Sequence, residues 1–150
     1  MLLLVTISIA VFVLMEFWAA FVHRTVYHGM LWDIHRSHHR ARRAGVFERN
    51  DIFVVIHAAA AMSVLFAGLQ FNLPVLVAVG TGISVYGLLY ALLHDGYIHG
   101  RLPLAWLGRW RLIRKLRDDH LYHHTGDVNA HFGLFFWNKT PSRIAERAAE

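Results

Sequence analysis

Residues 2–22 read LLLVTISIAVFVLMEFWAAFV, an apolar run whose only charged residue is Glu16, and His23 and His28 follow closely. At a rise of about 1.5 Å per residue, about 20 helical residues cross the roughly 30 Å hydrocarbon layer of a bilayer. A signal peptide would have a Lys or Arg before a shorter apolar run and a small-residue cleavage site after it, and the sequence has neither. This stretch therefore predicts a permanent membrane span.

Two further apolar runs indicate that the chain crosses the bilayer twice more. They cover residues 52–69 and 74–93, and the short stretch Gln70–Leu73 separates them. Pro74 suits the first turn of a helix, where its missing N–H would have no partner, and Asn72 suits a tight connection. The two runs therefore predict a membrane hairpin. Small residues on its second arm permit close helix contact: Gly80, Gly82 and Gly87.

The composition supports the same interpretation. The chain has 150 residues, enough for one domain, and 56% of them are hydrophobic while 17% are charged. It contains no cysteine, which excludes disulfides, cysteine-bound zinc or iron–sulfur clusters and thiol nucleophiles. We therefore expect an all-α integral membrane bundle that forms a single domain over residues 1–150.

The basic residues indicate how the spans are oriented. All 15 Lys and Arg lie within Arg24–Arg49 or Arg101–Arg147, and three spans place these two segments on the same side of the membrane. Because basic loops favour the cytoplasm, we expect a protein of the inner (cytoplasmic) membrane with its N-terminus outside and its histidine-rich segments and C-terminus inside. Orientation and contact with anionic headgroups then explain the net charge of +5. No basic soluble module remains to suggest a nucleic-acid partner.

The remainder of the chain is less apolar. Apolar residues recur near helical spacing with Arg and Lys between them, which predicts an amphipathic helix at the membrane interface over about residues 103–124. These apolar residues are Trp106, Trp110, Ile113 and Leu116. A short apolar patch, Phe132–Trp137, is compatible with a fourth, incomplete span. The bundle is therefore expected to have three to four transmembrane helices.

Histidines form an internal repeat. Each copy reads H-x4-H followed by H-x2-H-H, and the two motifs are separated by 6 residues in the first copy and by 20 in the second. Since each copy has five histidines, the repeat contains ten of the 12 in the chain. The first copy consists of His23, His28, His35, His38 and His39, and the second of His94, His99, His120, His123 and His124.

The spacing within each copy is suitable for binding a metal. Residues at i, i+3 and i+4 of a helix project from one face, which brings together the three imidazoles of each H-x2-H-H motif. Residues at i and i+5 do not align in an ideal α-helix, so an H-x4-H pair can share one metal only where the helix ends or unwinds. His23 and His94 lie at the expected cytoplasmic ends of their spans, where such loosening is allowed.

Ten imidazoles supply four or five nitrogens to each of two metal ions. Nitrogen ligands suit iron, zinc, copper or nickel rather than magnesium or calcium. A closed structural zinc site needs only four ligands, so this number favours a two-metal redox centre with positions left for oxygen. We expect two iron ions, which zinc can replace. His57 and His131 are expected to be packed core residues, and a loose metal buffer is the simpler alternative for the histidine-rich segments.

The sequence around these motifs matches a known pattern. Beside the histidines, the chain contains Met15-Glu16, Phe47-Glu48-Arg49-Asn50-Asp51, Tyr86–Tyr90, His94-Asp95-Gly96 and Phe132-Gly133. With these stretches, over about residues 10–137, it resembles the bacterial β-carotene 3-hydroxylases of the fatty acid hydroxylase/sterol desaturase superfamily. The histidine motifs are common to that superfamily, whereas the Glu-x-Asn-Asp and His-Asp-Gly stretches look specific to the carotenoid group.

The resemblance implies a membrane-embedded non-haem diiron monooxygenase. Such an enzyme hydroxylates C3 of the β-ionone ring of β-carotene and related carotenoids, toward cryptoxanthin and zeaxanthin, with O2 and with electrons from a ferredoxin and its reductase. The ten patterned histidines would be its iron ligands. The basic segment Arg101–Arg117 would suit an acidic ferredoxin, although contact with lipid headgroups explains it equally. One departure leaves ring preference open, because the loop Thr125–His131 is shorter than is usual in that family and lacks its common cysteine.

Carboxylates near the histidines are candidates for orienting them. Asp95 follows His94 directly, and Glu16 lies inside the first span, seven residues before His23 and on the same helix face. We expect both to take part in catalysis, Glu16 either behind a metal ligand or in a proton relay, with a hydrogen-bonded bundle residue as the alternative. Further acidic residues close to the motifs are Asp33, Glu48, Asp51, Asp118 and Asp119.

A carotenoid dissolved in the bilayer would approach the metals sideways, between the spans. The glycine-rich face of the third span would line a slot for the polyene together with nearby aromatic residues. These are Phe17, Trp18, Tyr86 and Tyr90, for which ordinary packing is the alternative.

Two other functions remain open at this point. A fatty-acyl or sterol hydroxylase or desaturase of the same superfamily would share the metal site and differ in its substrate tunnel. A histidine-rich membrane protein that transports or buffers metal would need no oxygenase activity. Transporters, however, usually place their ligands near the middle of the spans, whereas these histidines lie at one edge.

Overall fold

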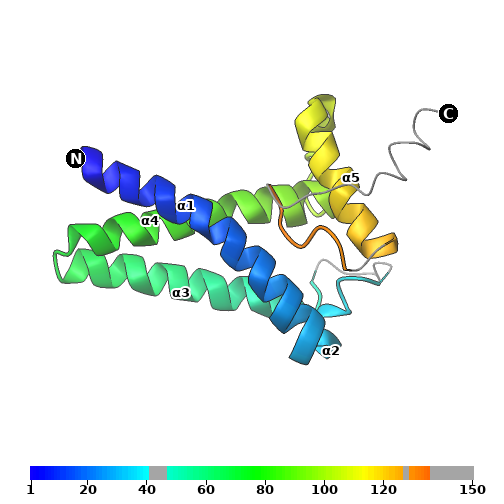
Figure 1. Cartoon of the computed structure of the whole chain (residues 1–150), viewed down its shortest axis with the longest axis horizontal. Helices are drawn as coiled ribbons and strands as arrows, with labels where there is room; N and C mark the ends of the chain where they lie inside the picture. The colour runs from blue at the N-terminus through cyan, green and yellow to red at the C-terminus, as the bar shows by residue number, and fades with distance from the viewer. Residues whose placement is uncertain (41–46, 127–128, 136–150) are drawn as a thin grey trace.

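The computed structural model describes residues 1–40, 47–126 and 129–135. Within these ranges every regular element is a helix, and three long helices form a bundle (Figure 1). Two of them continue as π-helices, α1 into η1 (His23–Met30) and α4 into η2 (Ala91–Ile98). The long helices are α1 (Leu2–Val22), α3 (Asp51–Gln70) and α4 (Pro74–Tyr90). The predicted all-α bundle is thus confirmed.

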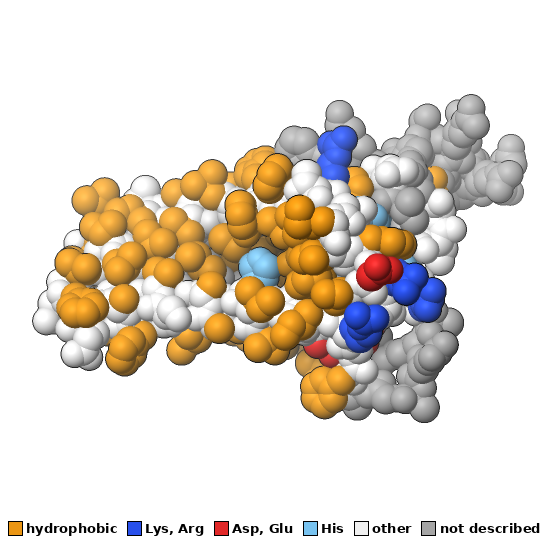
Figure 2. Space-filling model, turned by 90° about the horizontal axis from the view of Figure 1, so that it is seen from below, with side chains coloured by type: hydrophobic (Ala, Val, Ile, Leu, Met, Phe, Trp, Pro, Cys, Tyr) orange, Lys and Arg blue, Asp and Glu red, His pale blue; other side chains and the backbone are white. Residues whose placement is uncertain are grey.

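Three helices with their extensions are long and apolar enough to cross a membrane. The most apolar windows of Leu2–Met30, Asp51–Gln70 and Pro74–Ile98 have mean hydropathies of 2.3, 2.3 and 1.9. Many of their large apolar side chains, such as Ile9 and Phe66, are exposed, which is unfavourable in water and expected in lipid. Figure 2 shows such side chains over most of one face, with the charged ones gathered at one end. These helices associate the protein with a membrane.

The predicted fourth span is not seen in the part of the chain that can be described. Residues 132–135 are not helical. Phe136 and Trp137, the last two residues of the apolar patch, lie outside the described residues.

The predicted hairpin between the second and third spans is present as α3 and α4. Pro74 lies in the first turn of α4, and Asn72 takes a positive φ of 53°, which asparagine tolerates better than most residues. The N–H of Leu73 donates to the C=O of Gly68 at 2.8 Å and so closes the end of α3. The turn therefore follows from Asn72 and Pro74, as the sequence predicts.

Close packing joins α4 to each of the other two long helices, whereas α1 and α3 make almost no direct contact with each other. Glycines allow this proximity, because a Cβ on Gly80 would lie 2.8 Å from the backbone of Leu65, and one on Gly82 would lie 2.6 Å from the C=O of Ser8. Gly87 differs from the prediction, since a Cβ there would meet no atom within 4 Å. Gly87 therefore borders open space and makes no close contact with another helix.

Short elements complete the histidine-bearing end of the bundle. They are α2 (Trp32–His35), η3 (Ala105–Arg109) and α5 (Arg111–Thr125), and α5 crosses the end of α4 at a steep angle (Figure 1). The amphipathic helix expected over residues 103–124 is divided in two, because the backbone of Trp110 is extended. This bend lets the guanidinium of Arg109 lie over the rings of Trp106 and Trp110, 5.2 and 4.4 Å from their centroids.

Candidate metal centre

The π-helices carry the H-x4-H motifs. His23 and His28 belong to η1, while His94 lies in η2 and His99 directly follows it. The wider turn is evident in the hydrogen bonds, because the N–H of His99 donates to the C=O of His94, five residues earlier, at 2.9 Å. As expected, the α-helices end here, α1 at Val22 and α4 at Tyr90. Each continues as a wider π turn, which brings residues i and i+5 to the same side, and the backbone then leaves the helix at Gly29 in the first copy and at His99 in the second.

The H-x2-H-H motifs lie on α5 in the second copy and across the end of α2 in the first. In α5 the three histidines share one helix, as the spacing predicts. In the first copy α2 ends at His35, and the N–H of His38 donates to the C=O of His35 at 2.8 Å in the following turn. The helical face predicted for the first copy is therefore replaced by a tight turn that still keeps its histidines close.

The ten patterned histidines gather in two clusters, and each cluster takes four histidines from one copy of the repeat and one from the other. We call the group made mainly from the first copy the first cluster and the other group the second cluster. The first cluster contains His23, His28, His35, His39 and His123. The second cluster contains His38, His94, His99 and His120, together with His124, which contacts His120. The i+3 histidine of each H-x2-H-H motif thus crosses to the opposite cluster.

In the first cluster, the Nε2 atoms point toward a common centre. Those of His23 and His35 are 3.0 Å apart, those of His28 and His123 are 3.0 Å apart, and those of His35 and His39 are 3.3 Å apart. One ring nitrogen from each of the five histidines lies within 4.8 Å of all the others. A single metal ion can therefore contact all five.

The second cluster has the same arrangement around His120. Its Nε2 lies 3.1 Å from those of His94 and His99 and 2.9 Å from that of His124. The Nε2 of His38 is 3.2 Å from that of His94. The rings of His39 and His124 stack at 4.2 Å between centroids, which places the two clusters side by side.

Acceptors hold the outward-facing Nδ1 atoms of five of these histidines, which fixes the orientation of their rings. In the first cluster, His23 donates to the C=O of Phe132 at 2.9 Å and His123 to that of Ala130 at 2.6 Å, while His35 donates to the Asn50 side chain at 2.7 Å. In the second cluster, Nδ1 of His38 lies 2.7 Å from Glu48 and that of His94 lies 3.2 Å from Asp95. A proton held on Nδ1 leaves the Nε2 lone pair directed into the cluster.

The charge state of these rings also suits a metal. Burial lowers the pKa of His35 to about 4 and that of His39 to about 3, and it lowers the pKa values of His120 and His124 well below the usual 6.5. These imidazoles are therefore neutral at pH 7, the form that binds a metal. Several neutral lone pairs that face one another at about 3 Å are placed to share a cation, and imidazole donors fit a first-row transition metal.

A network of charged side chains contacts the second cluster through Nδ1 of His38. Glu48 accepts from His38, and Arg101 donates to Glu48 at 2.5 Å and to Asp51 at 2.6 Å. The second carboxylate oxygen of Asp51 accepts from the backbone N–H of Glu48 at 2.9 Å. Sequence reasoning counted Arg101 only as part of the basic segment. Its ion pairs join the start of α3 to the segment after η2.

The other acidic residues near the motifs have different partners. Asp33 is exposed and pairs with Arg36 at 3.4 Å, and Asp118 is also exposed. Asp119 is buried and accepts from Lys115 at 2.5 Å. Among all the acidic residues near the motifs, the two that are shown in direct contact with a cluster imidazole are Glu48 and Asp95.

Glu16 is buried in the bundle, with 1% of its surface exposed. One carboxylate oxygen accepts from the hydroxyl of Tyr86 at 2.8 Å, and the other accepts from the backbone N–H of Phe135 at 2.7 Å. Phe135 follows the carbonyls of Ala130 and Phe132, which hold His123 and His23, on the segment 129–135. Glu16 thus anchors this segment to α1.

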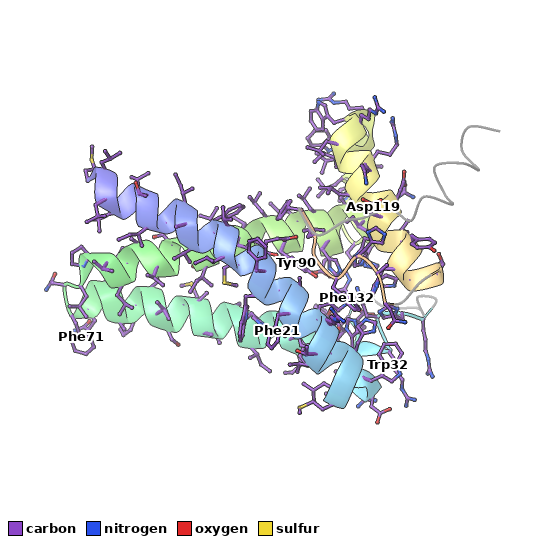
Figure 3. The ribbon with its side chains drawn as sticks, viewed as in Figure 1. Phe21, Trp32, Phe71, Tyr90, Asp119 and Phe132 are labelled. Atoms are coloured by element: carbon purple, nitrogen blue, oxygen red, sulfur yellow. The ribbon has the colours of Figure 1, made fainter. Side chains whose placement is uncertain are left out.

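Phe132, on the same segment, covers the first cluster. Its ring meets those of His23, His28 and His123 edge-on, with centroids 5.2 to 5.4 Å apart. Figure 3 shows Phe132 between α1 and α5, on the side of the imidazoles. An apolar ring in this position excludes water from the clustered nitrogens. The carbonyls and the ring of this segment have no signature in the sequence that identifies them.

A cavity of about 340 Å³ lies between α1, α3 and α4 and reaches both clusters. His23 and His35 of the first cluster and His94 of the second line its inner end, and apolar side chains form most of the remaining wall. Of the four aromatic residues expected to line a slot, Trp18, Tyr86 and Tyr90 do so. Phe17 is not among the lining residues and is partly exposed.

The two histidines outside the repeat lie apart from the clusters. His57 is half-buried in the cavity wall, where its Nδ1 donates to the C=O of Phe53 at 2.8 Å and lies 3.4 Å from the hydroxyl of Tyr27. His131 is buried beside Tyr122. Sequence reasoning treated His57 as a packed core residue, and an isolated histidine carries no signal that would have placed it in a cavity wall.

Comparisons with known proteins identify related sequences. The sequence model for fatty acid hydroxylases matches residues 8–140. The chain is 38% identical over 138 residues to beta-carotene 3-hydroxylase 1, chloroplastic, of Arabidopsis thaliana, a match that covers 89% of this chain and 44% of that protein. It is 44% identical over 110 residues to the beta-carotene hydroxylase of Pseudescherichia vulneris, covering 73% of this chain and 61% of that protein. The chain thus spans about half the length of the relatives it matches, and no solved structure matches it.

Proposed function

Because the chain belongs to the fatty acid hydroxylase family, we propose that it is a membrane-embedded diiron monooxygenase that hydroxylates C3 of the β-ionone ring of β-carotene and related carotenoids. The observation that carries this proposal is the pair of five-imidazole clusters at the inner end of an apolar cavity. The names of the relatives supply the substrate class. An apolar cavity within the spans suits a substrate that is dissolved in the bilayer.

Two iron ions fit the donor set, one held by each cluster, with zinc as a substitute. When bound, they supply the activation of O2 and the oxidising power that breaking an unactivated C–H bond requires. In the balanced reaction one oxygen atom enters the C3–H bond, and the other leaves as water after taking up two electrons and two protons. Since the family resemblance implies an external donor, we assign the electrons to a ferredoxin and its reductase.

The chain's own groups orient the ligands and keep water away. Acceptors on Nδ1 keep the Nε2 lone pairs of five histidines directed inward, and Phe132 covers the first cluster. We assign Asp95 the orientation of His94, which it contacts. For Glu16 the hydrogen bond to Phe135 favours a supporting role behind His23 and His123 over a proton relay.

The distribution of basic residues supports an orientation of the protein in the membrane and a docking face for its electron donor. With basic segments on the cytoplasmic side, the N-terminus lies outside and the histidine clusters and C-terminus lie inside, in the inner membrane of a bacterium. The exposed basic side chains of α5 are available to an acidic ferredoxin or to lipid headgroups. They are Arg111, Arg114, Lys115 and Arg117.

The test is expression in a bacterium that accumulates β-carotene, followed by product analysis. We expect C3-hydroxylated carotenoids from the wild-type chain and none from His94→Ala at the same protein level. Oxygenated acyl chains or sterols in place of hydroxylated carotenoids would favour the other hydroxylases of the superfamily. Two bound metal ions without any oxygenated product would favour a metal-binding protein without oxygenase activity.

A further inference from the structure

Exposed apolar side chains lie beside an arginine between the third span and the start of α5. The guanidinium of Arg109 lies over the rings of Trp106 and Trp110, and both rings are exposed. Leu102 and Leu112, on either side of them in the sequence, are also exposed. We call these five residues the η3 patch. Because a group of large exposed apolar side chains is unfavourable in water, the η3 patch marks a surface that contacts an apolar partner.

The η3 patch lies level with the end of the third span. A Cβ on Gly108 would lie 2.8 Å from the hydroxyl of Tyr97, and a Cβ on Gly96 would lie 3.0 Å from the side chain of Leu102. Both contacts are with η2, where the apolar segment Pro74–Ile98 ends. Span ends lie at the headgroup layer of a bilayer, where tryptophan and arginine are common anchors. The η3 patch therefore has the composition and the depth of a membrane-interface anchor.

The start of α5 extends beyond the long helices. Leu112, Leu116 and His120 follow one another at intervals of four residues, so they lie along one face of α5. This face is buried at Leu116 and His120, which are 6% and 4% exposed, whereas Leu112 is 68% exposed. Figure 1 shows this end of α5 projecting to one side of the bundle. The face that packs toward the bundle at Leu116 therefore has no protein against it at Leu112 in the part of the chain that the structure describes.

We propose that the η3 patch binds the membrane surface beside the bundle, with Trp106, Trp110 and Leu112 directed toward the hydrocarbon and Arg109 paired with acidic headgroups. The patch continues the apolar surface of the third span, and the positive charge of Arg109 complements lipid phosphates. The contact is restricted to the first part of the interfacial helix expected over residues 103–124, because from Leu116 onward the same face of α5 is buried.

A water-soluble electron donor would meet a different side of α5. Arg114 and Asp118 are exposed and lie on the side of the helix away from Leu116, so a soluble protein reaches them without displacing lipid from the η3 patch. Because α5 also supplies three of the clustered histidines, the anchor would fix their position relative to the membrane. The anchor requires the membrane spans but not the proposed hydroxylase activity.

Spin labels measure whether the η3 patch meets lipid or water. The chain has no cysteine, so a single introduced cysteine is the only labelling site. Leu112→Cys is compared with Asp118→Cys in the zinc-loaded protein, in vesicles that contain phosphatidylglycerol. We expect the label at residue 112 to be accessible to oxygen, which concentrates in lipid, and shielded from an uncharged paramagnetic complex that stays in water. The label at residue 118 should show the reverse. A label at residue 112 that is open to the water-soluble complex, or shielded from both agents by a protein contact, would overturn the proposal.

Removing the tryptophans tests the anchor itself. In the labelled Leu112→Cys protein, Trp106→Ala/Trp110→Ala should raise the access of the water-soluble complex to the label about twofold or more, because the apolar contact with the bilayer is lost. Phe71→Ala is the control, since it removes an exposed aromatic side chain at the opposite end of the bundle (Figure 3) and should leave this access unchanged. Unchanged access in the double variant would contradict the anchoring role.

Lipid charge tests the role of Arg109. Replacing phosphatidylglycerol by phosphatidylcholine should increase the access of the water-soluble complex to the label at residue 112, because the headgroups no longer attract the guanidinium. Arg109→Gln should abolish this difference between the two lipids. If access with Arg109 in place is the same in both lipids, the pairing with acidic headgroups is refuted.

Discussion

One histidine of each copy of the repeat lies in the cluster that is built mainly from the other copy, and this crossed arrangement can be tested by mutation. His38 belongs to the first copy of the repeat in sequence, but its Nε2 lies 3.2 Å from that of His94 in the second cluster. His38→Ala should therefore weaken the ion in the second cluster and leave the other ion unaffected. Removing a ligand should cost at least as much as removing a hydrogen-bond partner behind one, so we expect a loss of about 100-fold in affinity, or about 2.7 kcal/mol.

Double variants distinguish the crossed arrangement from one in which each copy of the repeat binds its own ion. If His38 shares an ion with His94, the variant His38→Ala/His94→Ala keeps one ion at wild-type affinity, because the first cluster is intact. The variant His38→Ala/His28→Ala damages both clusters, so it keeps no ion at wild-type affinity. If each copy of the repeat instead bound its own ion, these two results would be interchanged.

Chelator competition on the purified protein measures the two dissociation constants in each variant, with zinc in place of iron so that oxidation does not interfere. His57→Ala is the control, because it removes an imidazole that lies outside both clusters. It should keep both ions at wild-type affinity. The assignment of His38 to the second cluster is refuted if His38→Ala/His28→Ala retains one site with unchanged affinity while His38→Ala/His94→Ala retains none.

Three further predictions concern the groups around the clusters. Arg101→Ala leaves two partly buried carboxylates without their cation and should lower the metal affinity of the second cluster about 10-fold or more in chelator competition. Arg114→Ala removes an exposed arginine and should leave this affinity unchanged. Glu16→Gln weakens the anchoring hydrogen bonds and should lower the free energy of unfolding by about 1 kcal/mol in thermal unfolding, together with a reduced turnover. Undiminished turnover with normal metal content would rule out a proton relay. Gly82→Val must separate α1 from α4 and should destabilise the bundle by about 1 to 3 kcal/mol in denaturant unfolding, whereas Gly87→Val enters open space and should not; equal losses would contradict the packing argument.

The spans and the histidine repeat could be predicted from sequence because each rests on a pattern that one stretch of chain displays by itself. Residues 2–22 are apolar throughout, and Asn72 and Pro74 specify the turn of the hairpin locally. Gly80, Gly82 and Gly87 look alike in sequence. Only the packing of α4 against α1 and α3 shows that the first two touch a neighbour and the third faces a cavity.

The distribution of ligands between the clusters could not be predicted, for a physical reason. The i, i+3 and i+4 spacing predicts that three imidazoles share one face of a helix, but it does not show that two metal sites lie against that face. In α5, His120 and His124 turn to the second cluster while His123 turns to the first. The spacing of five residues in H-x4-H, which does not fit an α-helix, is in retrospect the local signal of a π-turn.

The crossed arrangement makes both halves of the chain necessary for each ion. Because the first cluster needs His123 from α5 and the second needs His38 from the turn after α2, neither copy of the repeat completes a site alone. Each bound ion would thus tie the segment after α1 to the segment after α4, and metal binding would contribute directly to the stability of this end of the bundle. None of the ten ligands lies on α3, so the bound ions would join the segments after α1 and after α4, while α3 is held mainly by its packing against α4 and packs little against α1. That sparse packing is also what leaves the cavity open, so the metal centre and access to it follow from the same arrangement of helices.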